Sequence, residues 1–289
     1  MSLLQAMKLL IVASIVLNVL ALAMRAHAQD VVHLVRNWRL GLRAFVAMFV
    51  LVPAIAVAMV AAFELRPEVE IALLVLSLSP VPPLLPRKQL KAGGEGSYIT
   101  GLLVAAALAS LLVLPLGLHL MGMLFEVGHR IPTASVARTL AITIGAPLLL
   151  GFAMRRLLGR ARAIHVSNLL GRAGMALLLA SGLVVLVAVA PAMWSLVGRG
   201  TLVALLAMIV AGLGAGYLMG SDVPENRAAL ALACATRHPG VAMGVIAAGF
   251  PDQRLAVVVV AMAVLLNVPA GIGFLRFIHR GGDASAVPR

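Results

Sequence analysis

The segment from Ala228 to Gly249 decides the fold of this chain, and it reads AALALACATRHPGVAMGVIAAG. It is long and apolar enough to cross a bilayer, yet Arg237 and His238 interrupt it directly before Pro239 and Gly240. A proline removes a backbone donor, and a glycine tolerates unusual dihedral angles. An arginine at the centre of a membrane span costs about 2.5–3.5 kcal/mol and usually faces a bundle interior or a water-filled cavity. The segment therefore predicts two half-helices that meet at an unwound break.

The composition indicates a helical membrane protein. Of the 289 residues 62% are hydrophobic and 11% are charged, and the mean hydropathy is +1.08. The net charge of +13 comes from residues in short loops between apolar runs, so it indicates membrane topology rather than nucleic-acid binding. The single cysteine, Cys234, excludes an intramolecular disulfide and a cysteine metal cluster.

Apolar runs between charged residues predict an all-α polytopic membrane protein with nine transmembrane helices, forming one integral membrane domain over residues 1–289. The predicted spans are 4–24, 41–63, 69–90, 98–124, 134–154, 173–193, 201–220, 227–249 and 255–277. Most of the 23 lysines and arginines then fall on one side of the bilayer. This bias predicts a multi-pass protein of the cell (plasma) membrane, with the N-terminus outside and the C-terminus in the cytoplasm.

The first span also resembles a signal peptide. Lys8 precedes an apolar core, and Ala26-His27-Ala28 fits a small-residue cleavage site. Cleavage would leave the arginines of the following loop on the outer side, against the usual distribution of positive charge. The charges therefore favour retention of residues 1–28.

A second interrupted span lies about 157 residues before the break at Arg237. There Ser77-Leu78-Ser79-Pro80-Val81-Pro82-Pro83 breaks the third predicted span. The same offset relates the second span to the seventh and the fourth to the ninth. The two broken helices run in opposite directions, which predicts an inverted repeat with halves at about 1–125 and 165–280 and two crossed discontinuous helices. Three further prolines are interpreted as kinks within unbroken helices, namely Pro53, Pro147 and Pro191.

The polar residues at the predicted crossing form a candidate binding site. From the breaks and the adjoining spans they are Ser77, Ser79, Ser110, Thr236, Arg237, His238 and Asn267. The residues that break the helices are Pro80, Pro82, Pro83, Pro239 and Gly240. Hydroxyl and amide groups can bind a substrate or an ion, although serine and threonine in membranes also bond helix carbonyls.

Arg237 predicts an anionic ligand, because its planar fork fits a carboxylate, a sulfonate or a phosphate. Half-helix N-termini at the breaks would add partial positive charge. The alternative is that Arg237 binds carbonyl groups at the break and acts as a structural staple. His238 likewise either carries a proton or is a neutral imidazole satisfied by the backbone.

The sequence also lacks several features that other functions require. All ten acidic residues lie in loops or at span ends, whereas a cation–proton antiporter needs a carboxylate near the bilayer centre. The chain has no glycine-rich phosphate loop, no plausible Ser/His/Asp set and no Cys/His cluster. We therefore expect neither an enzyme nor an ATP-driven pump, and neither a cofactor nor a metal centre.

The chain resembles the bile acid:sodium symporter (BASS) superfamily over essentially its whole length. The resemblance rests on the segments 76–83, 91–94 and 233–242, which look like the crossover motifs of the third and eighth spans of nine-helix members. It implies a panel domain and a core domain, with the crossed helices in the core and substrate moving in the cleft between them. It also implies transport of a small organic anion, often together with sodium.

Two departures from the family pattern argue against the sodium sites. Leu85-Pro86 stands where a Ser-Asn pair is expected, and residues 228–249 contain no Asp, Glu, Asn or Gln. Arg237 would also repel sodium at short range. Proton coupling through His238, facilitated exchange, and sodium held only by carbonyls and hydroxyls remain as alternatives. The competing function is a membrane sensor or scaffold that keeps the fold without transport.

Overall fold

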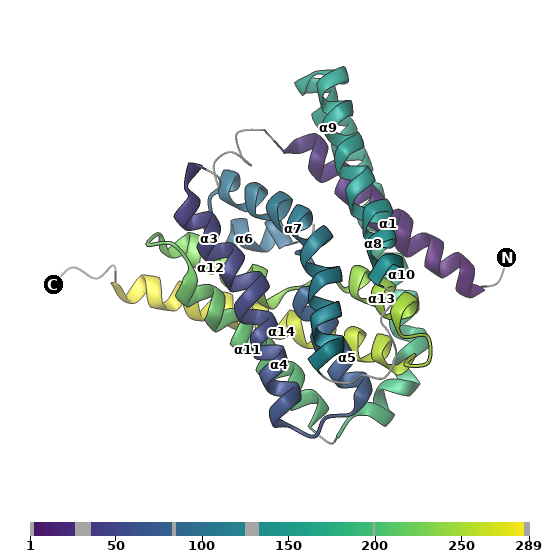
Figure 1. The fold of residues 1–289 in the computed structure, drawn as a ribbon. Coiled ribbons are helices and arrows are strands. Elements are labelled where there is room, and N and C mark those ends of the chain that lie inside the picture. Colours follow the sequence, from purple (N-terminus) through teal and green to yellow (C-terminus); the bar gives the residue numbers. More distant parts are fainter. Residues whose placement is uncertain (1–2, 27–35, 83–84, 125–132, 199, 286–289) are drawn as a thin grey trace.

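The computed structural model describes residues 3–26, 36–82, 85–124, 133–198 and 200–285, and every regular element among them is helical, as predicted (Figure 1). Helices suit an apolar chain in lipid because they satisfy their backbone polar groups internally. The elements are α1 (Leu3–Arg25), α3 (Trp38–Val46), η1 (Ala47–Leu51), α4 (Val52–Ala62), α5 (Pro67–Leu78), α6 (Leu85–Lys91), α7 (Gly96–Leu124), α8 (Thr133–Leu140), η2 (Ala141–Gly145), α9 (Ala146–Leu158), α10 (Arg160–Leu196), α11 (Thr201–Met219), α12 (Pro224–Ala235), α13 (Pro239–Gly249) and α14 (Leu255–Ser285).

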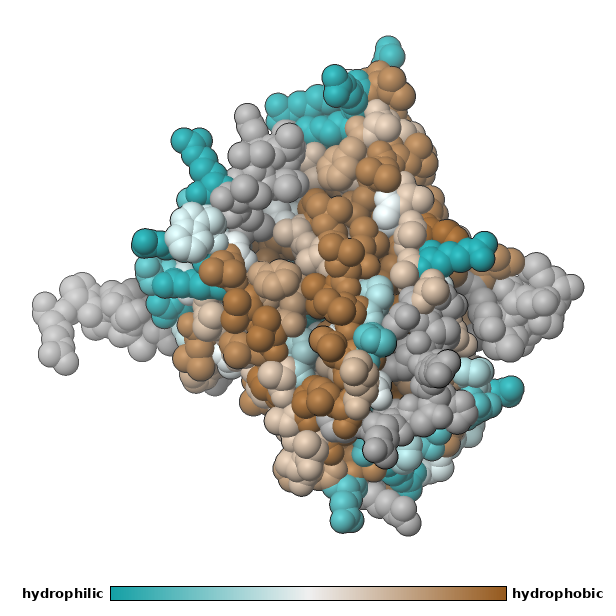
Figure 2. Space-filling view, viewed as in Figure 1, coloured by the Kyte–Doolittle hydropathy of each residue, from teal (hydrophilic) through white to brown (hydrophobic). Residues whose placement is uncertain are grey.

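Seven helices in the described part of the chain are long and apolar enough to cross a membrane, which makes this a multi-pass membrane protein. They are Trp38–Ala62, Gly96–Leu124, Val136–Leu158, Arg160–Leu196, Thr201–Met219, Asn226–Gly249 and Leu255–Ile278. Hydrophobic residues accordingly form a broad band through the middle of the face shown in Figure 2. Of the two other predicted spans, 4–24 coincides with α1, and 69–90 is divided between α5 and α6. The total of nine spans stays a prediction.

The helix breaks lie where the prolines predict them. α5 ends at Leu78, and Ser79 continues with extended backbone at φ −67° and ψ 149°. Helical structure resumes at Leu85 in α6, while Pro83 lies outside the described residues. The second break is shorter, because Pro239 is already the first residue of α13, a position for which its fixed φ is suited.

Pro53 and Pro147 are each preceded by a π-helical turn, which their interpretation as kinks misses. A proline inside a helix has no N–H and clashes with the carbonyl four residues earlier. The turns η1 and η2 each end two residues before their proline and shift the hydrogen bonds from i−4 to i−5. Helical structure therefore continues through both prolines, and Pro191 lies inside an unbroken α10.

Helix α1 packs along α9 and α10 on one side of the molecule (Figure 1). Arg155 fastens its C-terminal end, because Nη1 donates to the carbonyl oxygens of Arg25 at 2.7 Å and Met24 at 3.3 Å, and to that of Ala26. These are carbonyls that a helix leaves without internal partners. His27 and Ala28 of the predicted cleavage motif lie outside the described residues.

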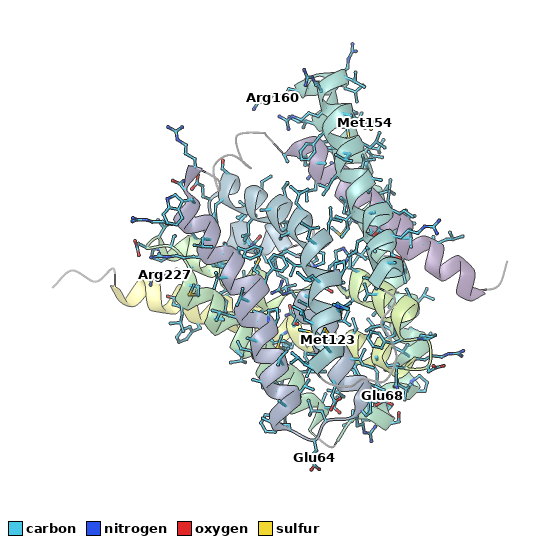
Figure 3. All side chains as sticks on the ribbon, viewed as in Figure 1. Glu64, Glu68, Met123, Met154, Arg160 and Arg227 are labelled. Atoms are coloured by element: carbon cyan, nitrogen blue, oxygen red, sulfur yellow. The ribbon has the colours of Figure 1, made fainter. Side chains whose placement is uncertain are left out.

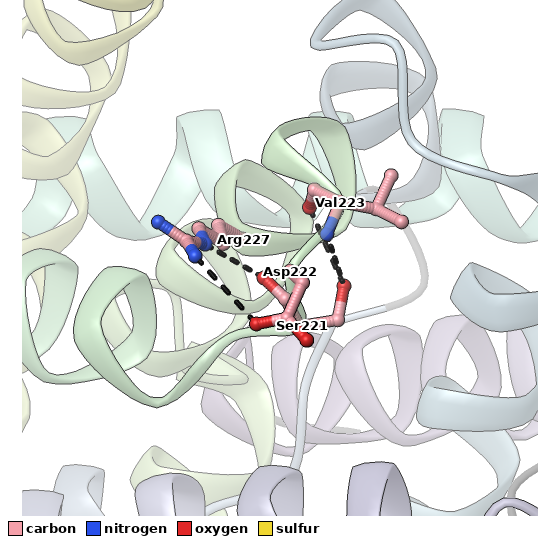
Figure 4. A network of polar contacts seen from close by, with 4 residues as sticks. All are labelled: Ser221, Asp222, Val223 and Arg227. Carbon is pink, nitrogen blue, oxygen red and sulfur yellow. Dashed lines mark hydrogen bonds and ion pairs between the residues drawn. The ribbon is translucent and has the colours of Figure 1, made fainter.

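Outside these helices, α11 and α12 pack very closely. A Cβ added to Gly216 would lie 2.5 Å from the Cα of Ala231, so only glycine fits there. The turn between these helices is held at the surface, where Arg227 Nε donates to the carbonyl of Ser221 at 2.6 Å and Nη2 lies 3.9 Å from Asp222 (Figure 4). Glu64 and Arg160 mark opposite ends of the whole molecule in Figure 3.

Candidate functional site

The two helix breaks are in direct contact. The backbone N–H of His238 donates to the carbonyl oxygen of Pro80 at 2.8 Å, and Arg237 Nη1 donates to that of Ser79 at 3.1 Å. The first two carbonyl groups after α5 are therefore bonded by the segment between α12 and α13. Residues about 157 positions apart in the sequence thus form one structural unit.

Arg237 is buried, with 7% of its surface exposed, and its guanidinium binds three carbonyl oxygens. Besides Ser79 they are those of Cys234, to which Nε donates at 3.2 Å, and Met48, to which Nη2 donates. The ring of Phe49 lies 5.8 Å from the guanidinium carbon. These bonds match the staple that the sequence offers as an alternative. They use three of the five guanidinium N–H groups, and Arg237 also lines the cavity described below.

His238 connects the break to α13 and leaves one ring nitrogen without a partner. Its Nδ1 accepts a hydrogen bond from the backbone N–H of Val241 at 3.4 Å, which makes His238 the N-cap of α13. An acceptor at Nδ1 places the proton of the neutral ring on Nε2. Nε2 is buried and has no hydrogen-bond partner among the described residues.

Thr236 and Asn267 form a second polar pair beside the break. The hydroxyl of Thr236 donates to Oδ1 of Asn267 at 3.0 Å, and Nδ2 of Asn267 donates to the carbonyl of Ala235 at 2.8 Å. The amide therefore binds the end of α12 to α14, and one of its N–H groups is not used in these bonds. Asn267 therefore lies beside the second break.

The three serines donate to carbonyls of their own helices, as serine in membrane helices commonly does. Ser77 bonds Leu74 at 2.7 Å, Ser79 bonds Val75 at 2.8 Å and Ser110 bonds Ala107 at 2.8 Å. All three are buried. Only Ser77 of the three contributes to the cavity wall.

A cavity of about 640 Å³ lies beside the meeting point of the breaks. Thr236, Arg237, His238 and Asn267 form part of its wall, and so do the break residues Pro82, Pro239 and Gly240. Most of the remaining wall is apolar and comes from α1, α10, α11 and α14. Pro80, Ser79 and Ser110 are not among the wall residues.

One charged wall residue is absent from the sequence-based site. Lys88 of α6 lines the cavity, although the sequence pattern treats it as a loop charge at the end of a span. Its position three residues after Leu85, another wall residue, is the helical spacing that could have revealed this. Among the described residues, no aspartate or glutamate contributes to the wall, and no group of three metal-binding side chains of the His, Cys, Asp or Glu type is present.

Paired helix breaks that meet beside a large cavity are typical of polytopic helical membrane transporters. More specifically, the chain belongs to the sodium bile acid symporter family, whose model matches residues 10–212. Members of this family are transporters rather than enzymes. The matched region includes the first break, most of α1 and all of α10, so the resemblance inferred from the sequence is confirmed at the level of the family. A comparison with curated proteins found no match.

Proposed function

We propose that the protein is a secondary active transporter that moves a small organic anion across the cell membrane. The observation that carries this proposal is the cavity of about 640 Å³ at the meeting point of the two breaks. A wall that is mostly apolar with a few convergent polar groups is typical of small-molecule sites. Half-helices that meet at a break are a common way for secondary transporters to build such sites.

The charge of the cavity supports an anionic substrate. Arg237 gives the meeting point a fixed positive charge, and its two remaining N–H groups can bind an acceptor. His238 Nε2 and the second amide N–H of Asn267 are further donors. Because no carboxylate lines the described wall, a cationic substrate would find no counter-charge there.

The arrangement of the helices supports alternating access. We assign α1, α8, α9 and α10 to a panel and the other helices to a core that carries both breaks. The cavity has wall residues on both sides of this division, including Ile11 and Leu178 from the panel and Ser77 and Asn267 from the core. Movement of the panel against the core would therefore open the cavity to either side of the membrane. The proposed topology has nine spans, the N-terminus outside and the C-terminus in the cytoplasm.

We further propose that transport does not require sodium. Backbone carbonyls at the breaks are the remaining candidates for sodium ligands, but Arg237 binds those of Ser79 and Cys234, and the N–H of His238 binds that of Pro80. A fixed cation at this place also repels a free one. Coupling to protons through His238, or exchange of one anion for another, fits these contacts better.

Uptake into reconstituted vesicles tests the proposal. Purified protein in phosphatidylcholine vesicles should take up at least one of radiolabelled cholate, pantoate and pyruvate, and the same unlabelled anion preloaded inside should accelerate uptake by exchange. Protein-free vesicles are the control. A sensor or scaffold would bind a labelled anion without time-dependent accumulation, and that result would refute transport of the anions tested.

A further inference from the structure

We infer that Lys88 is the residue that forms an ion pair with the anionic group of the substrate, and that this group lies at the end of the cavity between α6 and α14. The inference rests on the proposed function and adds the place and orientation of the substrate. Arg237 is the other cavity cation, but its three carbonyl bonds fix it to the protein. Lys88 has no such attachment among the described residues.

The orientation of α6 directs Lys88 into the cavity. Pro82, Leu85 and Lys88 follow one another at intervals of three residues and all contribute to the wall. On another face of the helix, Gln89 is buried and its Nε2 donates to the carbonyl of Ala229 in α12 at 2.7 Å. This bond fixes the rotation of α6 about its own axis, so the position of Lys88 is a consequence of packing.

The ammonium group of Lys88 lies against α14. A Cβ added to Gly271 would be 3.8 Å from Nζ, so the ammonium lies over this glycine. Gly271 follows Asn267 by four residues, and such residues lie on the same face of a helix. The charge is therefore about one helical turn from the Thr236–Asn267 pair, whose second amide N–H is available for the same ligand.

Lys88 lacks a counter-charge within the described protein. No hydrogen bond or ion pair joins its Nζ to another described residue, and the described wall contains no carboxylate. A partly buried charge without a partner destabilises a protein. An anion bound beside Lys88 would remove this penalty, so binding of the anion at this end of the cavity is favoured.

The chemistry of the wall defines the class of ligand. An ammonium group is a compact point charge with three donors, so it accepts a carboxylate, a sulfonate or a sulfate without the planar geometry that an arginine selects. The apolar part of the wall includes Leu178, Leu179, Leu183 and Leu186 of α10. The ligand is therefore an amphipathic monoanion, with its charged group at Lys88 and its apolar body against α10.

The first test needs no ligand and compares Lys88→Met with Lys91→Met. Lys91 is exposed on the same helix and serves as the matched control. If Lys88 is an uncompensated charge, Lys88→Met raises the melting temperature of the purified protein, whereas Lys91→Met leaves it unchanged. A lower melting temperature for Lys88→Met would identify a structural lysine and overturn the inference.

The second test measures binding of cholate, decanoate, pantoate and pyruvate, each beside its neutral primary amide, in phosphatidylcholine vesicles without anionic lipid. Lys88→Met should weaken binding of the anion about ten- to hundredfold and leave binding of the amide unchanged, while Lys88→Arg retains part of the affinity.

Equal anion affinity in the Lys88→Met variant and the wild type would overturn the role of Lys88 while transport stands. If a Lys88-dependent binding signal appeared only when anionic lipid was added to the vesicles, the partner would be a lipid headgroup, and the inference would also fall. If the wild type binds none of these anions, the proposed function and the inference fail together.

Discussion

The carbonyl oxygen of Met48 has no partner inside its own helix because Pro53, the residue that would bond it in the π-helical register, carries no N–H. The shifted register is observed directly, since the N–H of Val52 bonds the carbonyl of Ala47. Arg237 supplies the missing donor through Nη2. A proline in one helix therefore creates the acceptor that the arginine of a distant break uses.

This relationship predicts that Arg237 is essential for stability. Arg237→Ala would leave three buried carbonyls without their donor. Each unsatisfied carbonyl lowers the free energy of unfolding by about 1–3 kcal/mol. We expect a lower melting temperature in detergent, and a partial recovery with millimolar methylguanidinium, which can occupy the vacated space. Arg237→Lys should fall between Ala and wild type because it keeps the charge without the fork.

Arg254→Ala is the control for this series, since Arg254 is exposed. An Arg237→Ala protein that melts like the wild type would show that the carbonyl bonds do not matter. If Arg237→Lys melts normally but loses anion uptake, the guanidinium N–H groups serve the substrate rather than the fold.

His238 allows its two functions to be separated by two substitutions. His238→Asn keeps an acceptor near the position of Nδ1, so we expect the N-cap of α13 and the stability to be retained, while its shorter side chain places no donor at the position of Nε2. His238→Gln keeps a donor near Nε2 and loses the cap, which costs about 1 kcal/mol. We therefore expect His238→Asn to lower anion binding more than the melting temperature, and His238→Gln to lower the melting temperature more than anion binding. Equal effects of both variants on both measurements would contradict this division.

Replacement of sodium tests the coupling. Because the carbonyls at the breaks are already bonded, uptake should persist when choline replaces sodium. If His238 carries the coupled proton, a pH gradient should drive uptake in the wild type and have no effect in His238→Gln. Uptake that requires sodium and ignores the pH gradient would refute both expectations.

The contact between α11 and α12 predicts opposite effects for two glycines of one helix. Gly216→Ala would place a Cβ 2.5 Å from the Cα of Ala231, so we expect a substantially lower melting temperature. Gly214→Ala meets nothing within 4 Å and should stabilise α11 by up to about 1 kcal/mol, because alanine has the higher helix propensity. A similar melting temperature for the two variants would show that α11 and α12 separate easily.

Thiol labelling tests the topology. In a Cys234→Ala background, a cysteine at Glu64 should react with an impermeant reagent from outside the cell, and one at Gly96 should react only after permeabilisation. Both positions are exposed, and a side chain at Gly96 meets no other atom within 4 Å. Labelling of both from outside would contradict the proposed orientation.

The sequence predicts the elements of this fold better than their contacts. The breaks after Leu78 and Ala235 are local effects of proline chemistry, and the span 98–124 agrees closely with α7 because its apolar run has charged ends. By contrast, α10 begins at Arg160 rather than near 173, since an arginine-rich helix can continue beyond the apolar run that hydropathy detects.

The candidate site shows the same limit. The break predicts Thr236 and the adjoining span predicts Asn267, but no pattern indicates that Arg237 binds Met48, because that acceptor depends on a π-helical turn. Lys88 is missed for a related reason. Its charge places it at the end of a span, and its spacing from Leu85 alone does not show which way α6 turns, because packing that includes the bond between Gln89 and Ala229 sets that orientation.

The guanidinium of Arg237 also has a mechanical consequence. It ties η1, the end of α5 and the end of α12 together, so these three segments must travel as one rigid body. Helix α10 presents a leucine-rich wall to that body and is fastened to it near one end, where Arg66 Nη1 donates to the carbonyl of Ser195 at 2.8 Å. Because α10 is attached near its C-terminal end, a rotation about that end displaces its N-terminal end most. Pairs of spin labels on α10 and α12 should therefore report larger changes in distance near Ser167 than near Ser195.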